Sequence, residues 1–254
     1  MCCFSRPVGW VSQTRIFART FEPGVRGERQ YVVYNMHITA DGDVAMILPL
    51  PVAPESGEKA VEFINLENFP TFFTALNQGF PSVKYPRPQN PDPTAGGVRS
   101  TLEVQSVGRF EASYVPRVDD FERLDARFRL PRKIWDALPQ YANSGFAVFQ
   151  LKSGAKTFHP MAFSFPRANE KELFFPTVHI HDGEVHANAV FDHELYTQRQ
   201  PGEKMRLTQW TESAQPAGAF MDLAKAQGLL RPELHCYRIY LGGQRKNEDI
   251  RLPA

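Results

Sequence analysis

The apolar runs of this chain are short, and many of them end at prolines. The run from Val44 to Val52 contains Pro49 and Pro51, and the 254 residues include 21 prolines and 20 phenylalanines. Proline lacks a backbone donor, so within sheets it is confined to edges, strand ends and bulges. The pattern therefore predicts short strands joined by proline-bounded turns. No run approaches the roughly 20 apolar residues of a membrane helix, so we expect no membrane partner.

Several segments have the composition of β-strands. The segment from Gly145 to Lys152 is mostly apolar, as is the run from Val44, and each fits a strand buried on both faces. Residues 10–19 and 30–39 favour extended structure because they are rich in β-branched and aromatic residues. We expect further strands at residues 158–165, 173–181, 184–191 and 234–241.

Only short helices are predicted, at residues 57–66, 71–78 and 216–227, with two more within residues 119–138 that Pro131 separates. Few of them are placed as crossovers between strands, which favours an α+β fold of mainly antiparallel sheet with several short peripheral helices. No Gly-x-Gly-x-x-Gly follows a predicted strand, and no phosphate-binding Gly-x-x-x-x-Gly-Lys-Ser/Thr occurs. The common nucleotide-binding sites are therefore not expected.

The segment from Pro81 to Gly97 is rich in proline and has no hydrophobic period. It is the best internal boundary in the chain. At about 150 residues per domain, the length allows one or two domains. We expect one β-rich domain over residues 1–254, with a division into 1–80 and 98–254 as the alternative.

Charge and cysteine content exclude several classes of partner and location. The 29 Lys and Arg balance 28 Asp and Glu, and a net charge of +1 disfavours a nucleic-acid partner. Three cysteines (Cys2, Cys3 and Cys236) are too few for a disulfide scaffold. Because Arg6 and Arg15 interrupt the N-terminal apolar runs, no signal peptide is recognised and a cytoplasmic location is expected.

Four of the seven histidines lie between residues 179 and 193. Asp182-Gly183 is a preferred two-residue hairpin turn, and such a turn fixes which residues of the two strands face each other. Side chains alternate along a strand, so this register places four polar side chains on one face of the hairpin. They are His179, His181, Glu184 and His186.

Three neutral imidazoles and a carboxylate are suitable ligands for Zn, Fe, Cu or Ni. The sequence therefore predicts a transition-metal site at His179, His181 and His186, with Glu184 as fourth ligand or general base. An activated water or dioxygen at an open position would make the protein a hydrolase or an oxidoreductase. A solvated polar face explains the same alternation. The candidates for an outer shell are His159, Asp192 and His193.

Cys2 offers a second hypothesis. Removal of Met1 would leave its thiol beside a free α-amine, as in amino-terminal-nucleophile amidohydrolases. Ser5, Asn35 and Arg19 are then candidates for substrate contacts, while a small buried cysteine is the simpler interpretation. A third hypothesis is a non-catalytic binding or assembly module. The ligand in each case is a small molecule or a peptide, and the sequence indicates no oligomeric state.

Three stretches of the chain carry a family resemblance: Met1-Cys-Cys-Phe4, Leu48-Pro-Leu-Pro51 and His179-Ile-His-Asp-Gly-Glu-Val-His186. With their flanking residues they resemble a bacterial family of uncharacterised proteins over most of the chain. The first fifty residues are also distantly similar to a larger family of unknown function, whose members are typically exported. Neither resemblance implies an activity.

Overall fold

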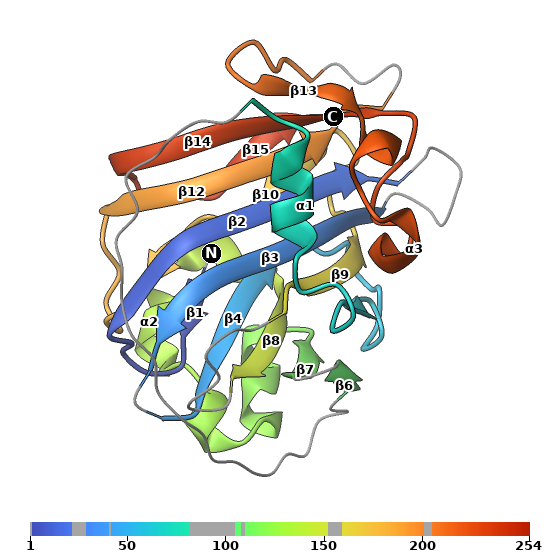
Figure 1. Cartoon of the computed structure of the whole chain (residues 1–254). Coiled ribbons are helices and arrows are strands. Elements are labelled where there is room, and N and C mark those ends of the chain that lie inside the picture. Colours follow the sequence, from blue (N-terminus) through green and yellow to red (C-terminus); the bar gives the residue numbers. More distant parts are fainter. Residues whose placement is uncertain are drawn as a thin grey trace.

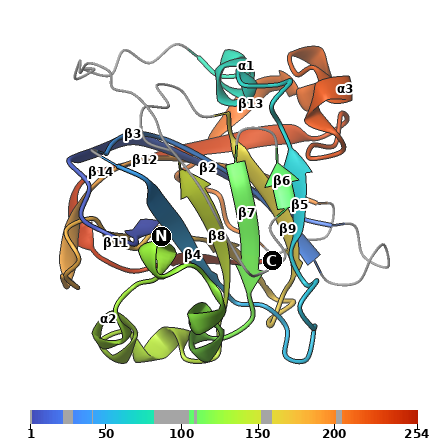
Figure 2. The same cartoon turned by 90° about the horizontal axis from the view of Figure 1, so that it is seen from below.

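The fold is a sandwich of two β-sheets with short helices on both outer faces, as Figures 1 and 2 show. We describe it from a computed structural model, which covers residues 2–21, 29–40, 42–81, 105–107, 110–151, 159–200 and 205–254. The inner faces of the two sheets form a core rich in phenylalanine, which includes Phe4, Phe149 and Phe163.

The larger sheet has seven strands in the order β13-β14-β12-β2-β3-β9-β5. Its strands pair antiparallel except for β12 and β2, which are parallel. Their bounds are β2 Trp10–Thr20, β3 Arg29–Thr39, β5 Glu62–Asn65, β9 Met161–Pro166, β12 Asn188–Gln198, β13 Thr211–Pro216 and β14 His235–Lys246.

The second sheet has six strands in the order β11-β1-β4-β8-β7-β6, and β10 and β15 form a separate pair. Here β1 and β11 are the parallel pair. The α+β class is thus confirmed, and both large sheets are mixed, with one parallel pair in each. The bounds are β1 Cys2–Phe4, β4 Val44–Leu50, β6 Gln105–Val107, β7 Phe110–Val115, β8 Gly145–Leu151, β10 Glu172–Phe175, β11 His179–Ile180 and β15 Ile250–Pro253.

Strands β4 and β8 are buried along their whole lengths, as their apolar sequences predict. In β4, Met46 and Leu48 point into the core between the sheets, whereas Ala45 and Ile47 pack beneath α2 on the outer face. Pro49 lies beyond the residues of β4 that pair with β1, so its missing donor costs no bond on that edge.

The helices lie on the two outer faces. Figure 2 shows α1 (Phe72–Gln78) and α3 (Leu223–Ala226) above the seven-stranded sheet and α2 (Arg132–Asp136) on the opposite side of the molecule. The 3₁₀ helices are η1 Val118–Arg123, η2 Ala126–Phe128, η3 Pro139–Tyr141 and η4 Ala217–Ala219. The predicted helix at 71–78 is confirmed.

Two of the predicted helices are wrong in whole or in part. Residues 57–66 form turns and strand β5, and the Ser56 hydroxyl donates to the carbonyl of Ala53 instead of capping a helix. The predicted helix at 216–227 is broken into η4 and the single turn α3. Both segments are anchored by long-range contacts, β5 by pairing with β9 and η4 by a bond from Ala217 to Leu234.

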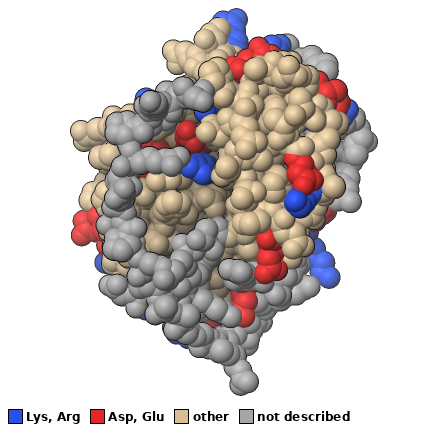
Figure 3. Space-filling view, in the orientation of Figure 1, with Lys and Arg blue, Asp and Glu red and all other residues tan. Residues whose placement is uncertain are grey.

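Strands from both sides of the proline-rich segment pair with each other, β3 with β9 and β4 with β8. Apart from Pro81, the segment 81–97 lies outside the described residues, and the division into domains stays a prediction. Within the described part of the chain, no helix has the length and apolar character needed to span a bilayer. Acidic and basic residues are interspersed on the face seen in Figure 3.

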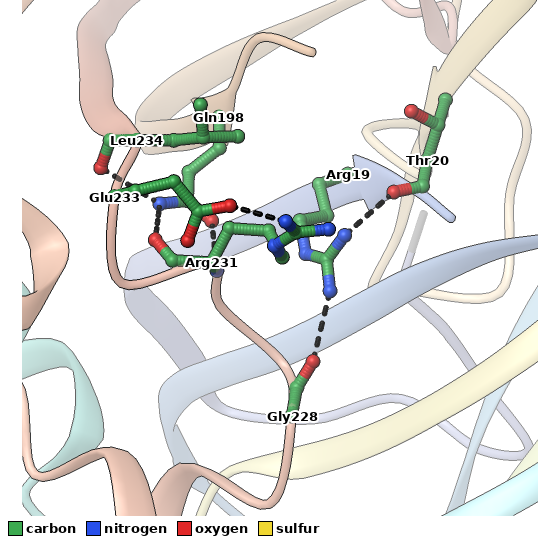
Figure 4. Close-up of polar contacts among 7 residues, drawn as sticks. All are labelled: Arg19, Thr20, Gln198, Gly228, Arg231, Glu233 and Leu234. Carbon is green, nitrogen blue, oxygen red and sulfur yellow. Dashed lines mark hydrogen bonds and ion pairs between the residues drawn. The ribbon is translucent and has the colours of Figure 1, made fainter. Parts of the chain in front are cut away.

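Arg19 anchors the connection between α3 and β14 to the sheet. Its guanidinium donates to the carbonyl of Leu229 at 2.8 Å. It also donates to the carbonyls of Gly228 at 2.8 Å and Thr20 at 2.9 Å, as Figure 4 shows. Gln198 holds the same connection by donating to the carbonyls of Arg231 and Leu234. A guanidinium used in this way is not available as the substrate contact expected for Arg19.

Candidate functional site

The histidine segment does not form the expected hairpin. Strand β11 consists of His179 and Ile180 alone, and it pairs in parallel with β1, so that Cys2 lies beside His179. The chain then leaves the sheet until β12 begins at Asn188. The prediction of a hairpin with His179, His181, Glu184 and His186 on one face is therefore wrong, because β11 pairs with the N-terminal strand instead.

Two residues of the predicted site, His186 and Glu184, are exposed, and both form hydrogen bonds with Asp182. The His186 Nε2 lies 2.7 Å from Asp182 Oδ2, and the Glu184 amide donates to Asp182 Oδ1 at 3.0 Å. The hydrogen bond and charge of Asp182 raise the pKa of His186. The assignment of both residues as metal ligands stays a prediction.

Three histidines nevertheless come together, and we call His179, His181 and His193 the histidine cluster. The ring centroid of His179 lies 4.9 Å from that of His181 and 4.6 Å from that of His193. The cluster thus joins β11 of the six-stranded sheet to β12 of the seven-stranded sheet. Phe191 packs against His179 and His193, and the ring centroid of Phe4 lies 5.6 Å from that of His181.

Each member of the cluster has a buried ring nitrogen without a hydrogen-bond partner in the described structure. These atoms are Nε2 of His179, Nε2 of His181 and Nδ1 of His193. The Asp192 carboxylate is 3.8 Å from the last of them, too far for a hydrogen bond. Buried polar atoms are usually paired, so three orphaned nitrogens in one cluster call for an explanation.

Burial also fixes the charge of these rings. Desolvation lowers the pKa of His179 to about 3 and that of His181 to about 4, and in His179 the neighbouring His181 adds to the effect. Desolvation and the proximity of His179 lower the pKa of His193 well below its ordinary value. All three imidazoles are therefore neutral at pH 7, the form in which histidine binds a metal.

The segment that carries two of these histidines is held at both of its edges. On one side Val8 donates to the carbonyl of His181 at 2.9 Å. On the other side the Asn247 side chain accepts from the amide of His179 at 2.7 Å and donates to its carbonyl at 2.9 Å. Asp249 accepts from the amides of Thr177 and Val178 just before it. The backbone of the cluster is thus fixed, while the imidazole nitrogens are not.

The predicted outer shell is only partly assembled. His159 lies elsewhere and packs against Phe110 at 4.4 Å, because β9 pairs with β3 and β5 and not with residues 173–181. Asp192 accepts from the amide of Gln13 on the opposite face of β12. His193 was expected in the outer shell and is a member of the cluster itself. Its position in phase with the apolar Phe191 and Leu195 is the sequence signal that it belongs to a buried face.

The cysteines divide into two groups. The backbone of Cys2 is next to His179 in the β1–β11 pair. Cys3 and Cys236 are both fully buried, and desolvation raises the pKa of Cys236 to about 12. Of the other residues considered with Cys2, Ser5 accepts from the amide of Ala45.

No family model and no curated protein matches the chain. Among solved structures, the crystal structure of baculovirus P35 is similar at 12% identity and a TM-score of 0.49, over 96% of this chain and 97% of that one. P35 in a complex with caspase-8 gives a TM-score of 0.44 at 12% identity, with 96% of each chain covered. A mutated P35 after caspase cleavage gives 0.47 at 12% identity, over 96% of this chain and 99% of that one. At these levels the similarity assigns no function to the chain.

Proposed function

We propose that the protein binds a divalent transition-metal ion through the histidine cluster. The observation that supports this proposal is the set of three adjacent, neutral imidazoles, each with an orphaned buried nitrogen. Nitrogen ligands of this kind bind zinc, iron, copper and nickel, each with a different affinity. The proposal keeps His179 and His181 from the sequence hypothesis and replaces His186 with His193.

His179 is spaced from each of the other two rings as two ligands of one ion are spaced from each other. With Zn–N bonds of about 2.0–2.1 Å and tetrahedral angles, the centroids of two ligating imidazoles lie about 5 Å apart. The two contacts that His179 makes in the cluster measure 4.9 and 4.6 Å between centroids. Within the described residues, no three His, Cys, Asp or Glu side chains point at one ion position as they stand. Binding therefore requires at least one imidazole to turn about its own side-chain bonds.

Three protein ligands would leave one position of a tetrahedral ion for water. An ion held by these three residues would supply activation of water near neutral pH, which is the basis of metal-dependent hydrolysis. An ion that changes oxidation state would support redox chemistry at the same position. We propose the metal site itself, and hydrolase and oxidoreductase are the two classes of activity that it would support.

Elemental analysis of tag-free protein tests this proposal. The wild type is compared with His193→Gln, which removes one cluster imidazole, and with the matched control His186→Gln, which removes an exposed one. We expect about one metal ion per chain in the wild type and in His186→Gln, and less than a tenth of that in His193→Gln. Circular dichroism confirms that each variant is folded.

Two results would overturn the proposal. One is a wild-type protein without metal after incubation with zinc, iron, copper and nickel salts. The other is a loss of metal in His186→Gln with full retention in His193→Gln, which would move the site to the exposed pair of His186 and Asp182.

One observation favours a second candidate, a nucleophilic role for Cys2. The backbone of Cys2 pairs with that of His179, so this residue lies next to the histidine cluster, and after removal of Met1 its own α-amine is the base that an amino-terminal nucleophile uses. We propose a reducing compartment, the cytoplasm, in which this thiol stays free. Brief treatment with iodoacetamide at pH 7 followed by peptide mass mapping tests the role. It predicts rapid labelling of Cys2 that slows at least tenfold when the α-amine is acetylated, and slow, unchanged labelling contradicts it.

A further inference from the structure

A pocket of about 740 Å³ lies at the ends of β7 and β8, on a part of the molecule that the histidine cluster does not include. One wall is the connection between β4 and β5, from Val52 to Glu58. The facing wall consists of the end of β7, the start of η1 and the turn before β8. Pockets of a few hundred to a thousand cubic ångströms are typical of small-molecule sites.

The two walls are tied together by charge. Arg123 on η1 pairs with Glu58 of the facing wall at 2.6 Å and with Asp120 at 3.4 Å. These two acidic groups of the pocket are therefore already neutralised in part by a protein cation. The pair of Arg123 and Glu58 links the two walls and leaves the remaining charges of the pocket unused.

Two charges of opposite sign in the pocket have no ion pair with any described residue. They are the guanidinium of Arg117 and the carboxylate of Glu55, both of which line it. Arginine binds carboxylates through two parallel hydrogen bonds, and a carboxylate binds an ammonium group. The pocket thus has one site for each end of a zwitterion.

The rest of the lining is suited to the middle of such a ligand. The Tyr114 hydroxyl and the Asn143 amide have no hydrogen-bond partner among the described residues, so both can bond to a peptide group. The Tyr114 ring lies against Gly145, where a Cβ atom would be 2.5 Å from the phenol oxygen. Apolar surface between these groups comes from Val52, Pro54, Pro116 and Ala142.

From this arrangement we infer that the pocket binds a zwitterionic amino acid or short peptide with an apolar side chain. Arg117 holds the carboxylate end, Glu55 holds the ammonium end, and Tyr114 and Asn143 bond to polar groups between them. This site does not depend on the metal site, and either one can exist without the other.

Calorimetric titration of the full chain tests the inference with four probes: L-leucine, L-leucyl-L-leucine, N-acetyl-leucyl-leucine and leucyl-leucinamide. We expect saturable binding of the free dipeptide or of leucine, at least tenfold weaker when either end is capped. The relative affinities of leucine and the dipeptide distinguish a single amino acid from a peptide. Capped probes that bind as tightly as the free dipeptide would overturn the inference, as would no binding of either free zwitterion at millimolar concentration.

Variants assign the two ends. Arg117→Gln should weaken the free dipeptide at least tenfold and leave leucyl-leucinamide, which has no carboxylate, unchanged. Glu55→Gln should weaken the free dipeptide and leave the N-acetylated probe unchanged. Arg245→Gln, an exposed substitution outside the pocket, is the matched control and should bind like the wild type. Equal affinity for the free dipeptide in Arg117→Gln, Glu55→Gln and the wild type would contradict the assignment.

Discussion

The side chain of Asn247 brackets the peptide of His179. Its Oδ1 accepts from the His179 amide at 2.7 Å, and its Nδ2 donates to the His179 carbonyl at 2.9 Å. The same Nδ2 also donates to the carbonyl of His186 at 2.9 Å. A residue near the C-terminal end of the chain therefore does for β11 what a hairpin partner strand does elsewhere. It positions the histidine cluster without belonging to it.

Asn247→Ala should loosen this segment. The loss of three hydrogen bonds to backbone predicts a decrease of about 2 kcal/mol in the free energy of unfolding. It also predicts metal affinity lower by roughly 10–100-fold, the usual effect of losing a group that orients a ligand. Denaturant unfolding and zinc titration measure the two effects. Asn169→Ala at an exposed turn is the control, and equal zinc affinity in both variants would contradict the positioning role.

Alkaline pH should destabilise the protein through its buried tyrosines. Burial raises the pKa of Tyr114 to about 12 and, first through burial and then through Asp249, raises that of Tyr141 further. The unfolded phenols ionise near pH 10. The folded state thus holds protons that the unfolded state has lost, and stability falls as the pH rises above about 10.

Tyr141→Phe isolates one part of this effect. The Tyr141 hydroxyl donates to Asp249 Oδ2 at 2.6 Å, so its removal should cost about 2 kcal/mol at pH 7. The variant should also lose less stability than the wild type between pH 10 and 12. Denaturant unfolding at a series of pH values measures both, and an unchanged alkaline slope would show that Tyr141 is not one of the groups responsible.

Arg19→Met should be strongly destabilising. The side chain is 3% exposed, and its removal leaves the carbonyls of Leu229 and Gly228 without their donor. Hydrogen bonds from charged donors contribute about 1.5–3 kcal/mol each, so we expect a loss of about 3 kcal/mol or more. Arg245→Met on the exposed end of β14 should change the unfolding free energy by about 0.5 kcal/mol at most. Similar losses in the two variants would contradict the anchoring role.

Cys236 should be unreactive in the folded protein. Its side chain is fully buried and its pKa is raised to about 12, so almost no thiolate forms at pH 8. Iodoacetamide at pH 8 should leave Cys236 unmodified in native protein and alkylate it after denaturation, as peptide mass mapping can show. Modification of Cys236 at equal rates in both states would indicate that this strand opens readily.

Local sequence patterns were enough for four strands of the sandwich, β2, β3, β4 and β8. The apolar segments that become β4 and β8 are buried on both faces because they lie between the seven-stranded sheet and α2. Their composition indicates this directly. Segment 173–181 was predicted as one strand but divides into β10 and β11, because it pairs first with β15 and then with β1. Such a break depends on residues far away in the chain and has no local signal.

The candidate site shows the same limit. His179 and His181 share a face, as alternation predicts, because that property belongs to the segment alone. The residues that surround these two histidines cannot be predicted from the segment alone. The turn preference of Asp182-Gly183 is outweighed by pairing with β1 and by the bonds to Asn247. His193 joins the cluster through the approach of the two sheets, which only the tertiary structure provides.

The most direct test of the metal site is a crystal structure of tag-free protein loaded with zinc, with anomalous diffraction recorded at the zinc edge. The histidine cluster predicts one peak about 2.0–2.1 Å from Nε2 of His179, Nε2 of His181 and Nδ1 of His193. A zinc peak at His186 and Asp182, or no peak at all in the loaded crystals, would contradict it.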